Sequence, residues 1–429
     1  MVPLTEAPLH PKVRWFLIGW MFVISSAMFL DRVNIGVAGK SLERDFHLTD
    51  IQFGWIGSAF LAGYALFQPF AGRFADRFGP RRVICFGALW WSVFTALTGS
   101  VPSTLTWSLA LLMITRFSLG LGEAVIYPAA NRFVAAWMPI RERGLANGLI
   151  FAGVGAGSAL APPVVVAIMG RYGWRASFWM SALIGIFVGA VWYAIFRNRP
   201  EDHPWVEKQE LAEIQAGLPD TIKIARPLPW GTILADRNFI ALTFSYFTFG
   251  YAAYMFFTWF FIYLSSVRGL NLKSSAFYST LPFIAMAVCS SAGGWISDHL
   301  SRRFGMRWGR CAMAAGALCL SALFLILGPR AADPRLASIV LAGGAGALYV
   351  SQSMYWSVSS EIAGSSAGSV SGVMNMGCQI GGVITASLSP WIAREFGWTA
   401  SFGTAAVLCL LGGLAWLLVR PEQAIMENN

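Results

Sequence analysis

The chain has 429 residues, of which 56% are hydrophobic and only 12% charged, and its formal net charge is +10. So small a polar fraction cannot cover the surface of a soluble globule of this length, which excludes a soluble fold. The basic residues lie in short loops rather than on one face of an element, so the positive charge does not indicate a nucleic-acid partner. The composition therefore predicts a protein embedded in the lipid bilayer.

Apolar runs of about 20 residues, the length that a helix needs to cross a bilayer, recur along the chain. They lack the alternation of barrel strands, and helices satisfy their own backbone hydrogen bonds in lipid. We therefore expect an all-α membrane protein with twelve transmembrane helices. The runs lie near residues 15–38, 51–72, 82–101, 105–137, 144–169, 174–196, 238–265, 276–298, 310–328, 336–358, 366–392 and 399–420.

Lysines and arginines gather in alternate loops between these runs. If the N-terminus is cytoplasmic, most of them, including Arg73, Arg132 and Arg302, fall on the cytoplasmic side. Cytoplasmic loops carry such an excess of positive charge in membrane proteins. We therefore expect both termini in the cytoplasm, and the short loops and tails favour a bacterial inner membrane.

The first apolar run carries two neighbouring charges, Asp31 and Arg32. A charged side chain at the bilayer centre costs roughly 2.5–3.5 kcal/mol, so such residues are rarely incidental. Arg32 can bind a carboxylate bidentately, and we expect it to anchor a substrate while Asp31 takes a proton. Two alternatives stay open: an ion pair that only fixes helix packing, and a helix end from which Arg32 reaches the interface.

The second run places Tyr64 and Gln68 four residues apart, hence on one face of a helix. Both are candidate substrate-binding residues, although helix packing would equally account for them. The loop that follows contains Gly72, Asp76, Arg77 and Arg81. We expect Asp76 to accept hydrogen bonds from a neighbouring helix N-terminus and to pair with Arg77 or Arg81.

Such a contact would form a conformational latch that closes the cytoplasmic side during transport. The alternative is that these arginines only provide the positive charge of a cytoplasmic loop.

The fourth run contains Arg116 and Glu123, seven residues apart on one helix face. That separation is about 10 Å of rise, too far for a tight ion pair on a straight helix, so their partners should lie on the first run. We expect Glu123 to share proton coupling with Asp31, and Arg116 to contribute to the substrate site. A purely structural role for the two residues is the alternative.

Two motifs recur at nearly equal offsets along the chain. Residues 72–78 resemble residues 294–300, and residues 173–178 resemble residues 397–402. The chain is therefore expected to consist of two parallel six-helix repeats, 1–197 and 238–429, with a substrate site at their interface. A polar linker, 198–237, should contain a short cytoplasmic surface helix that begins near Pro204 and ends at Gly217.

The second repeat has no charged residue deep in its helices, which argues against a doubly charged phosphate ligand and for a monoanion. It offers hydrogen-bonding and stacking groups instead, and packing accounts for any one of them equally well. Most aromatic residues between Phe244 and Tyr263 are expected to face lipid or packed helices. The polar and aromatic candidates are Tyr251, Tyr254, Gln352, Ser353, Trp356, Asn375 and Gln379.

Four segments resemble the major facilitator superfamily, and within it the anion:cation symporter branch, which includes sugar-acid, tartrate and phthalate carriers and sialin. The resemblance implies the two-half transporter fold, proton coupling at Asp31 and Glu123, and a latch at Asp76. The Tyr64 and Gln68 pair also matches this branch. The segments are Gly72-x-x-x-Asp76-Arg77-x-Gly79-x-Arg81-Arg82, Asp31-Arg32-Val-Asn34-Ile, Arg116 to Gly122-Glu123-Ala-x-x-Tyr127-Pro128, and His203-Pro204-Trp205-Val206 with Glu210-Leu211.

Taken together, the sequence predicts a proton-coupled symporter that imports a small organic anion, namely a sugar acid, hydroxy-acid or related carboxylate, by alternating access. It is expected to act as a monomer without cofactor or metal. Sodium coupling, anion exchange and a carboxylate sensor that does not transport are the alternatives. No nucleophile–base pair or metal-ligand cluster stands out in the sequence, so an enzyme is not expected.

Overall fold

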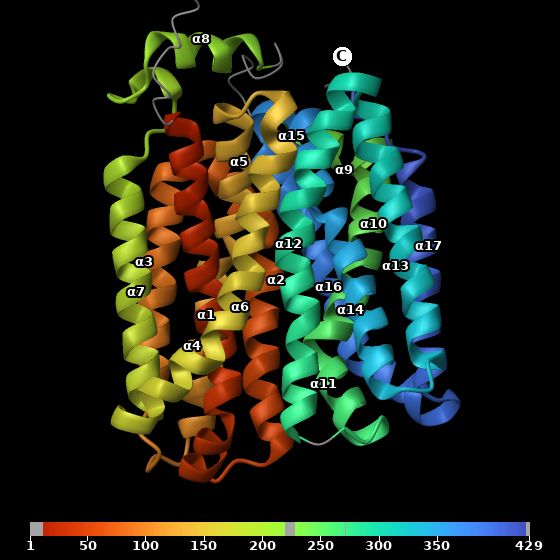
Figure 1. Ribbon diagram of the computed structural model, residues 1–429. Coiled ribbons are helices and arrows are strands. Elements are labelled where there is room, and N and C mark those ends of the chain that lie inside the picture. The colour runs from red at the N-terminus through yellow and green to blue at the C-terminus, as the bar shows by residue number, and fades with distance from the viewer. Residues whose placement is uncertain (1–11, 219–227, 271, 426–429) are drawn as a thin grey trace, which may run out of the picture.

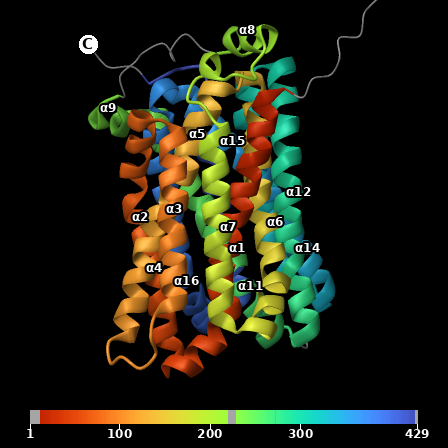
Figure 2. The same cartoon turned by 90° about the vertical axis from the view of Figure 1, so that its left-hand side faces the viewer.

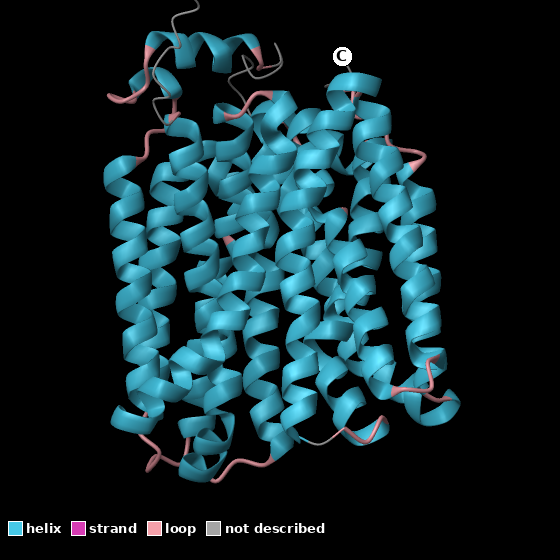
Figure 3. Cartoon of the chain, in the orientation of Figure 1, coloured by secondary structure: helices cyan, strands magenta, loops and turns pink. Residues whose placement is uncertain are grey.

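The computed structural model describes residues 12–218, 228–270 and 272–425, and within these ranges the chain forms helices joined by short connections, with no strand (Figures 1 and 3). The long helices run side by side along one axis of the molecule. Two short helices from the linker, α8 and α9, lie at the same end of this bundle (Figure 2). That end is called the linker end below, and the opposite one the far end.

The helix boundaries follow the order of the chain. Before the linker, the elements are α1 (Val13–Phe46), α2 (Asp50–Phe78), α3 (Pro80–Ser100), α4 (Ser108–Ala124), α5 (Ile126–Trp137), the 3-10 turn η1 (Ile140–Glu142), α6 (Arg143–Tyr172) and α7 (Trp174–Ile195). The linker contributes the turn η2 (Pro200–Asp202), α8 (Lys208–Ala216) and α9 (Trp230–Ala235).

After the linker, the α-helices are interrupted by π-helical segments and short 3-10 turns. The elements are α10 (Arg237–Tyr254), the π segment η4 (Met255–Trp259), α11 (Phe260–Ile262), the π segment η5 (Tyr263–Val267), α12 (Leu272–Phe304), the π segment η6 (Arg307–Ala312), α13 (Met313–Leu327), η7 (Gly328–Arg330), α14 (Pro334–Val350), α15 (Gln352–Ala363), η8 (Gly364–Ser366), α16 (Ala367–Phe396) and α17 (Trp398–Trp416).

Ten helical stretches within the described residues are long and apolar enough to cross a bilayer. One of these stretches, 334–396, by itself contains α14, α15 and α16. The chain is thus a multi-pass helical membrane protein, as its composition predicts. The count of twelve spans and the division into two repeats stay predictions.

Two of the expected helices are each divided into a pair of α-helices at a single residue. Run 105–137 forms α4 and α5, which are separated at Val125. Pro128 explains this break, because proline has no N–H to donate to the carbonyl four residues earlier, at Ala124. Run 336–358 is likewise divided into α14 and α15 at Ser351, whose hydroxyl donates to the Leu348 carbonyl at 2.6 Å and so competes with the helical hydrogen bonds.

The second sequence motif marks a helix–helix corner. Gly173 precedes α7 with φ 80°, and Gly397 precedes α17 with φ 85°. This left-handed backbone region is readily accessible only to glycine, so both corners require it. The Gly-Trp motif therefore identifies the start of a helix in each case.

Helices from before and after the linker approach closely where glycines face each other. A Cβ atom on Gly72 of α2 would lie 2.1 Å from the Gly368 carbonyl oxygen of α16. A Cβ atom on Gly294 of α12 would lie 2.1 Å from the Gly144 carbonyl oxygen of α6. Any larger residue would separate these helices, so glycine permits the two contacts.

The linker helix α8 begins at Lys208, later than the expected start near Pro204. The backbone N–H of Trp205 donates to the His203 ring at 3.2 Å, which holds residues 203–205 in a turn. Glu210 of α8 caps the start of α1 by accepting hydrogen bonds from the backbone N–H groups of Val13 and Arg14 at 3.0 and 3.1 Å. The linker is therefore fixed to the first transmembrane helix at its N-terminus.

Candidate functional site

A cavity of about 270 Å³ lies between helices from before and after the linker. Four of the predicted substrate-binding residues line it: Arg32 from α1, Tyr64 from α2, Tyr254 from α10 and Asn375 from α16. The Asn375 amide donates to the Tyr64 hydroxyl at 3.4 Å, so the two sides of the chain meet at the cavity wall. Gln352 and Gln379, also singled out from the sequence, contribute further polar groups to it.

Arg32 is the basic residue on the cavity wall, and it forms an ion pair with Glu123 of α4 through its Nε atom. Glu123 is fully buried, whereas 13% of the Arg32 side chain is exposed. The Arg32 guanidinium also lies over the ring of Tyr64, at 4.3 Å from its centroid. Arg32 Nη2 and Glu123 Oε1 have no hydrogen-bond partner, so the ion pair leaves binding capacity on both groups.

Asp31 and Arg116 lie behind the cavity wall. Thr95 donates to Asp31 Oδ2 at 2.6 Å, and the strongest charge interaction of Asp31 is with Arg116. The Arg116 guanidinium lies 5.1 Å from the Phe60 ring centroid, and that of Arg32 lies 5.2 Å from it. Arg32 and Glu123 therefore form an ion pair between α1 and α4, whereas Asp31 and Arg116 interact only through their charges, without a hydrogen bond.

Arg116 differs from its expected position, because it does not line the cavity. Its Nε and Nη1 atoms lack hydrogen-bond partners although the side chain is buried. The packing of α4 explains the difference: this helix lies mainly against α2 and α3 and contributes no residue to the cavity lining. Arg116 thus interacts with Asp31 through its charge and does not reach the cavity.

Three further candidates, Gln68, Ser353 and Trp356, are buried outside the cavity lining. The Gln68 amide and the Ser353 hydroxyl have no hydrogen-bond partner. Trp356 donates to the hydroxyl of Tyr246, a lining residue, at 3.0 Å. Trp356 therefore supports the wall from behind.

Several aromatic lining residues were expected to face lipid or packed helices. Tyr246, Phe249 and Phe257 line the cavity instead. Their spacing of three and eight residues places them along one helical face, and this shared face can be read from the sequence. The sequence does not show which face of this aromatic-rich helix points inward.

At the linker end, Asp76 caps the N-terminus of α16. Its carboxylate accepts hydrogen bonds from the backbone N–H groups of Gly368 and Ser369, at 2.9 and 2.7 Å, and from the Ser369 hydroxyl at 2.6 Å. The nearest cation is Arg132, at 3.7 Å. A carboxylate is favourable at this position because a helix N-terminus carries partial positive charge.

The arginines expected to pair with Asp76 lie elsewhere. Arg81 Nε donates to the Tyr193 carbonyl at 2.9 Å, and the Arg77 guanidinium lies over the ring of Phe78. Because neighbours on a helix point about 100° apart, Arg77 cannot follow Asp76 into the contact with α16. The expected pairing with Arg77 or Arg81 is therefore replaced by Arg132.

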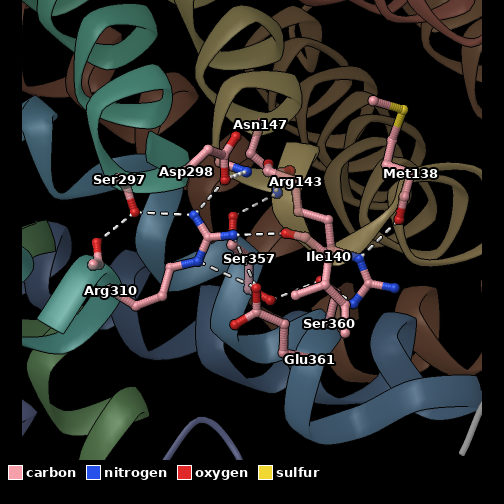
Figure 4. A network of polar contacts seen from close by, with 12 residues as sticks. Met138, Ile140, Arg143, Asn147, Ser297, Asp298, Arg310, Ser357, Ser360 and Glu361 are labelled. Atoms are coloured by element: carbon pink, nitrogen blue, oxygen red, sulfur yellow. Dashed lines mark hydrogen bonds and ion pairs between the residues drawn. The ribbon is translucent and has the colours of Figure 1, made fainter. Parts of the chain in front are cut away.

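Asp298, in the recurrence of the same motif, makes a corresponding contact with the N-terminus of α6 (Figure 4). It accepts hydrogen bonds from the backbone N–H groups of Gly144 and Leu145 at 2.9 and 2.7 Å. Arg310 bridges Asp298 and Glu361, at 2.7 and 3.1 Å. This network was not among the predicted site residues, although the repeated Gly-x-x-x-Asp motif could have revealed it.

Comparisons with known proteins agree with this geometry. Residues 21–386 match the family model of the Major Facilitator Superfamily. A probable sulfoacetate transporter of Cupriavidus necator is 33% identical over 96% of this chain and 94% of its own length. A hexuronate transporter of Bacillus subtilis is 27% identical, covering 96% of each chain.

Among solved structures, the superfamily transporter FucP in the outward conformation aligns with a TM-score of 0.71 and 15% identity, over 95% of this chain and 99% of that one. The resemblance predicted from the sequence is confirmed, and so is the expectation that the chain is not an enzyme. Both of these relatives are named as transporters of organic anions. The protein is a membrane transporter that belongs to the Major Facilitator Superfamily.

Proposed function

We propose that this protein imports a small organic anion, a sugar acid, hydroxy-acid or related carboxylate, together with protons. The observation that carries this proposal is the ion pair between Arg32 and Glu123 at the wall of a cavity between the two sides of the chain. Relatives named as transporters of sulfoacetate and hexuronate support an anionic substrate. The protein would act as a monomer with twelve spans in two repeats, in a bacterial inner membrane.

Proton coupling follows from competition for Arg32. A substrate carboxylate and ionised Glu123 would both bind the Arg32 guanidinium, which forms its strongest hydrogen bonds with an anion. Protonation of Glu123 would weaken the ion pair and free Arg32 to bind the substrate. Asp31 would take a proton in the same way beside Arg116, which gives the second coupling carboxylate.

Alternating access would then require the linker end to open. In this structure Asp76 and Asp298 hold that end together by capping α16 and α6. These contacts join helices on opposite sides of the linker, so their release would allow the two sides to rock about the cavity. Substrate and proton binding would set the balance between the two states.

The test is proton movement into proteoliposomes on addition of candidate carboxylates without sodium. The parent protein is expected to alkalinise the outside. Glu123→Gln, which cannot titrate, is expected to lose proton-driven accumulation while retaining exchange of internal for external substrate. Glu43→Gln removes an acid that pairs with Lys40 at the surface, and it should behave as the parent protein.

Concentrative uptake by Glu123→Gln at the parental rate would disprove the coupling role of this residue. Uptake that requires sodium, or that occurs only by exchange, would instead favour a differently coupled anion carrier. Binding without transport would indicate a carboxylate sensor.

A further inference from the structure

The cavity wall is dominated by aromatic rings. Ten of its lining residues are aromatic, and five of these are phenylalanines with no polar group: Phe29, Phe60, Phe151, Phe249 and Phe257. Val33, Leu61 and Val154 add aliphatic surface. A ligand in this cavity is therefore surrounded mainly by groups that can offer it dispersion and stacking contacts, but few hydrogen bonds.

Many polar groups of the cavity wall already form hydrogen bonds with other residues of the protein. The Tyr127 hydroxyl bonds Ser25 at 2.8 Å, and the Tyr254 hydroxyl donates to Gln379 at 2.6 Å. The Tyr246 hydroxyl accepts a hydrogen bond from Gln352 at 2.9 Å, in addition to the one from Trp356. Ser158 Oγ and Gln352 Oε1 on the wall have no partner and can each pair with one ligand group. A ligand with many hydroxyl groups would have to break the other bonds or leave most of its hydroxyls unpaired, and both are unfavourable.

The charge of the wall suits a single anionic group. Arg32 is its basic residue, and the second arginine, Arg116, lies behind Phe60. The Arg32 guanidinium lies 4.8 Å from the ring centroid of Phe29, so apolar surface adjoins the anion-binding group directly. The cavity volume of about 270 Å³ lies just below the roughly 300–1,000 Å³ of sites for drug-sized ligands, which favours a compact molecule.

We propose that the substrate is a compact monocarboxylate with an apolar, aromatic body, rather than a polyhydroxylated sugar acid. Its carboxylate binds Arg32 when Glu123 releases it, and its ring packs between Phe60, Phe151 and Phe249. This assignment rests on the proposed transport function and narrows its substrate class.

The test is binding of two monocarboxylates, benzoate and D-galactonate, to the full-length protein in lipid nanodiscs, measured by isothermal titration calorimetry. Benzoate is expected to bind about tenfold more tightly or better, because galactonate must bury several hydroxyl groups against aromatic rings. Binding is measured in place of uptake, since the neutral form of benzoic acid crosses lipid bilayers by itself.

Val154→Thr adds one hydroxyl to the wall with little change of shape. This variant is expected to reduce the preference for benzoate over galactonate by roughly three- to tenfold, because it introduces a polar group beside the ring. Val165→Thr is the matched control, since Val165 is buried in the same helix but does not line the cavity. It should leave the preference unchanged.

Tighter binding and proton-coupled uptake of galactonate would overturn this substrate assignment and leave the proposed transport function intact. Equal effects of Val154→Thr and Val165→Thr would overturn the assignment of benzoate to this cavity. Binding of neither carboxylate, together with no proton movement across the wider panel of carboxylates, would refute the transport function as well.

Discussion

At the scale of single residues, the site contains two buried acids and two arginines contributed by α1 and α4. Asp31 and Arg32 are neighbours in sequence, yet their main partners on α4 differ: Arg32 forms an ion pair with Glu123, and the largest charge interaction of Asp31 is with Arg116. Neighbours on a helix point about 100° apart, so each can reach a different position on the facing helix. A buried charge without such a partner would destabilise the fold, so neutralisation has a structural role beside the proposed coupling.

His203 gives a residue-scale prediction about pH. Its Nε2–H donates to the Ile195 carbonyl at 2.8 Å, and its Nδ1 accepts from Trp205, so the ring is neutral in this structure. Burial lowers the pKa of His203 below its usual value. Because the unfolded ring has a pKa of about 6.5, docking of the linker is fully stable above that pH and weakens as the pH falls below it.

His203→Gln keeps a donor for Ile195 but cannot titrate in this range. The protection factors of the α8 amides, which compare their hydrogen-exchange rates with the intrinsic rates at the same pH, should therefore fall on acidification in the parent protein and fall less in the variant. His299→Gln, at an exposed position, is the control and should retain the parental fall in protection. Identical pH profiles for His203→Gln and the parent would show that His203 does not hold the linker.

At the scale of helices, close contacts through glycine set how α2 meets α16 and how α6 meets α12. Each contact is accompanied by a carboxylate that caps the partner helix, Asp76 in one case and Asp298 in the other. Small residues allow the backbones to approach, and the approach brings the carboxylate within hydrogen-bond distance of the helix N-terminus. Packing and capping therefore depend on each other.

This dependence predicts the effect of adding a methyl group to α2. In Gly72→Ala, the new Cβ meets the Gly368 carbonyl, and overpacking of this kind costs roughly 1–3 kcal/mol. The population with an open linker end is expected to increase. Spin labels at the exposed positions Arg82 and Arg302 would report a longer distance across that end.

Gly54→Ala is the matched control in the same helix, because a Cβ atom there meets nothing within 4 Å. Its distance distribution should equal that of the parent protein. Asp76→Asn, which removes the capping charge, should shift the population in the same direction as Gly72→Ala. If both variants kept the parental distribution, the latch at the linker end would be refuted.

At the scale of the whole molecule, the linker, the start of α1 and the end of the described chain lie at one end of the bundle (Figure 1). The distribution of lysine and arginine predicts that this end is cytoplasmic. In a cysteine-free background, Glu201→Cys and Thr104→Cys place single thiols in exposed loops at the linker end and the far end.

A membrane-impermeant maleimide applied to intact bacterial cells should label Thr104→Cys and leave Glu201→Cys unmodified. Both positions should react after the cells are lysed, which controls for exposure of the thiols. Labelling of Glu201→Cys in intact cells would reverse the proposed orientation.

The sequence by itself determined that the protein lies in a membrane, where its apolar helices are, and which helix carries each charged residue. These properties follow from composition and local pattern. The length of an apolar run and the free-energy cost of a charge in lipid can both be assessed without knowing the fold. The Asp76 contact with a helix N-terminus was likewise foreseeable from the loop motif.

Only the tertiary structure decided which of these groups meet. It placed Arg32 at the cavity and Arg116 behind it, paired Asp76 with Arg132, and turned Tyr246, Phe249 and Phe257 toward the ligand space. The reason is that a helix made of apolar and aromatic residues on all sides carries no local signal for its inward face. That face is set by the packing of residues distant in sequence, and with it the chemistry of the site.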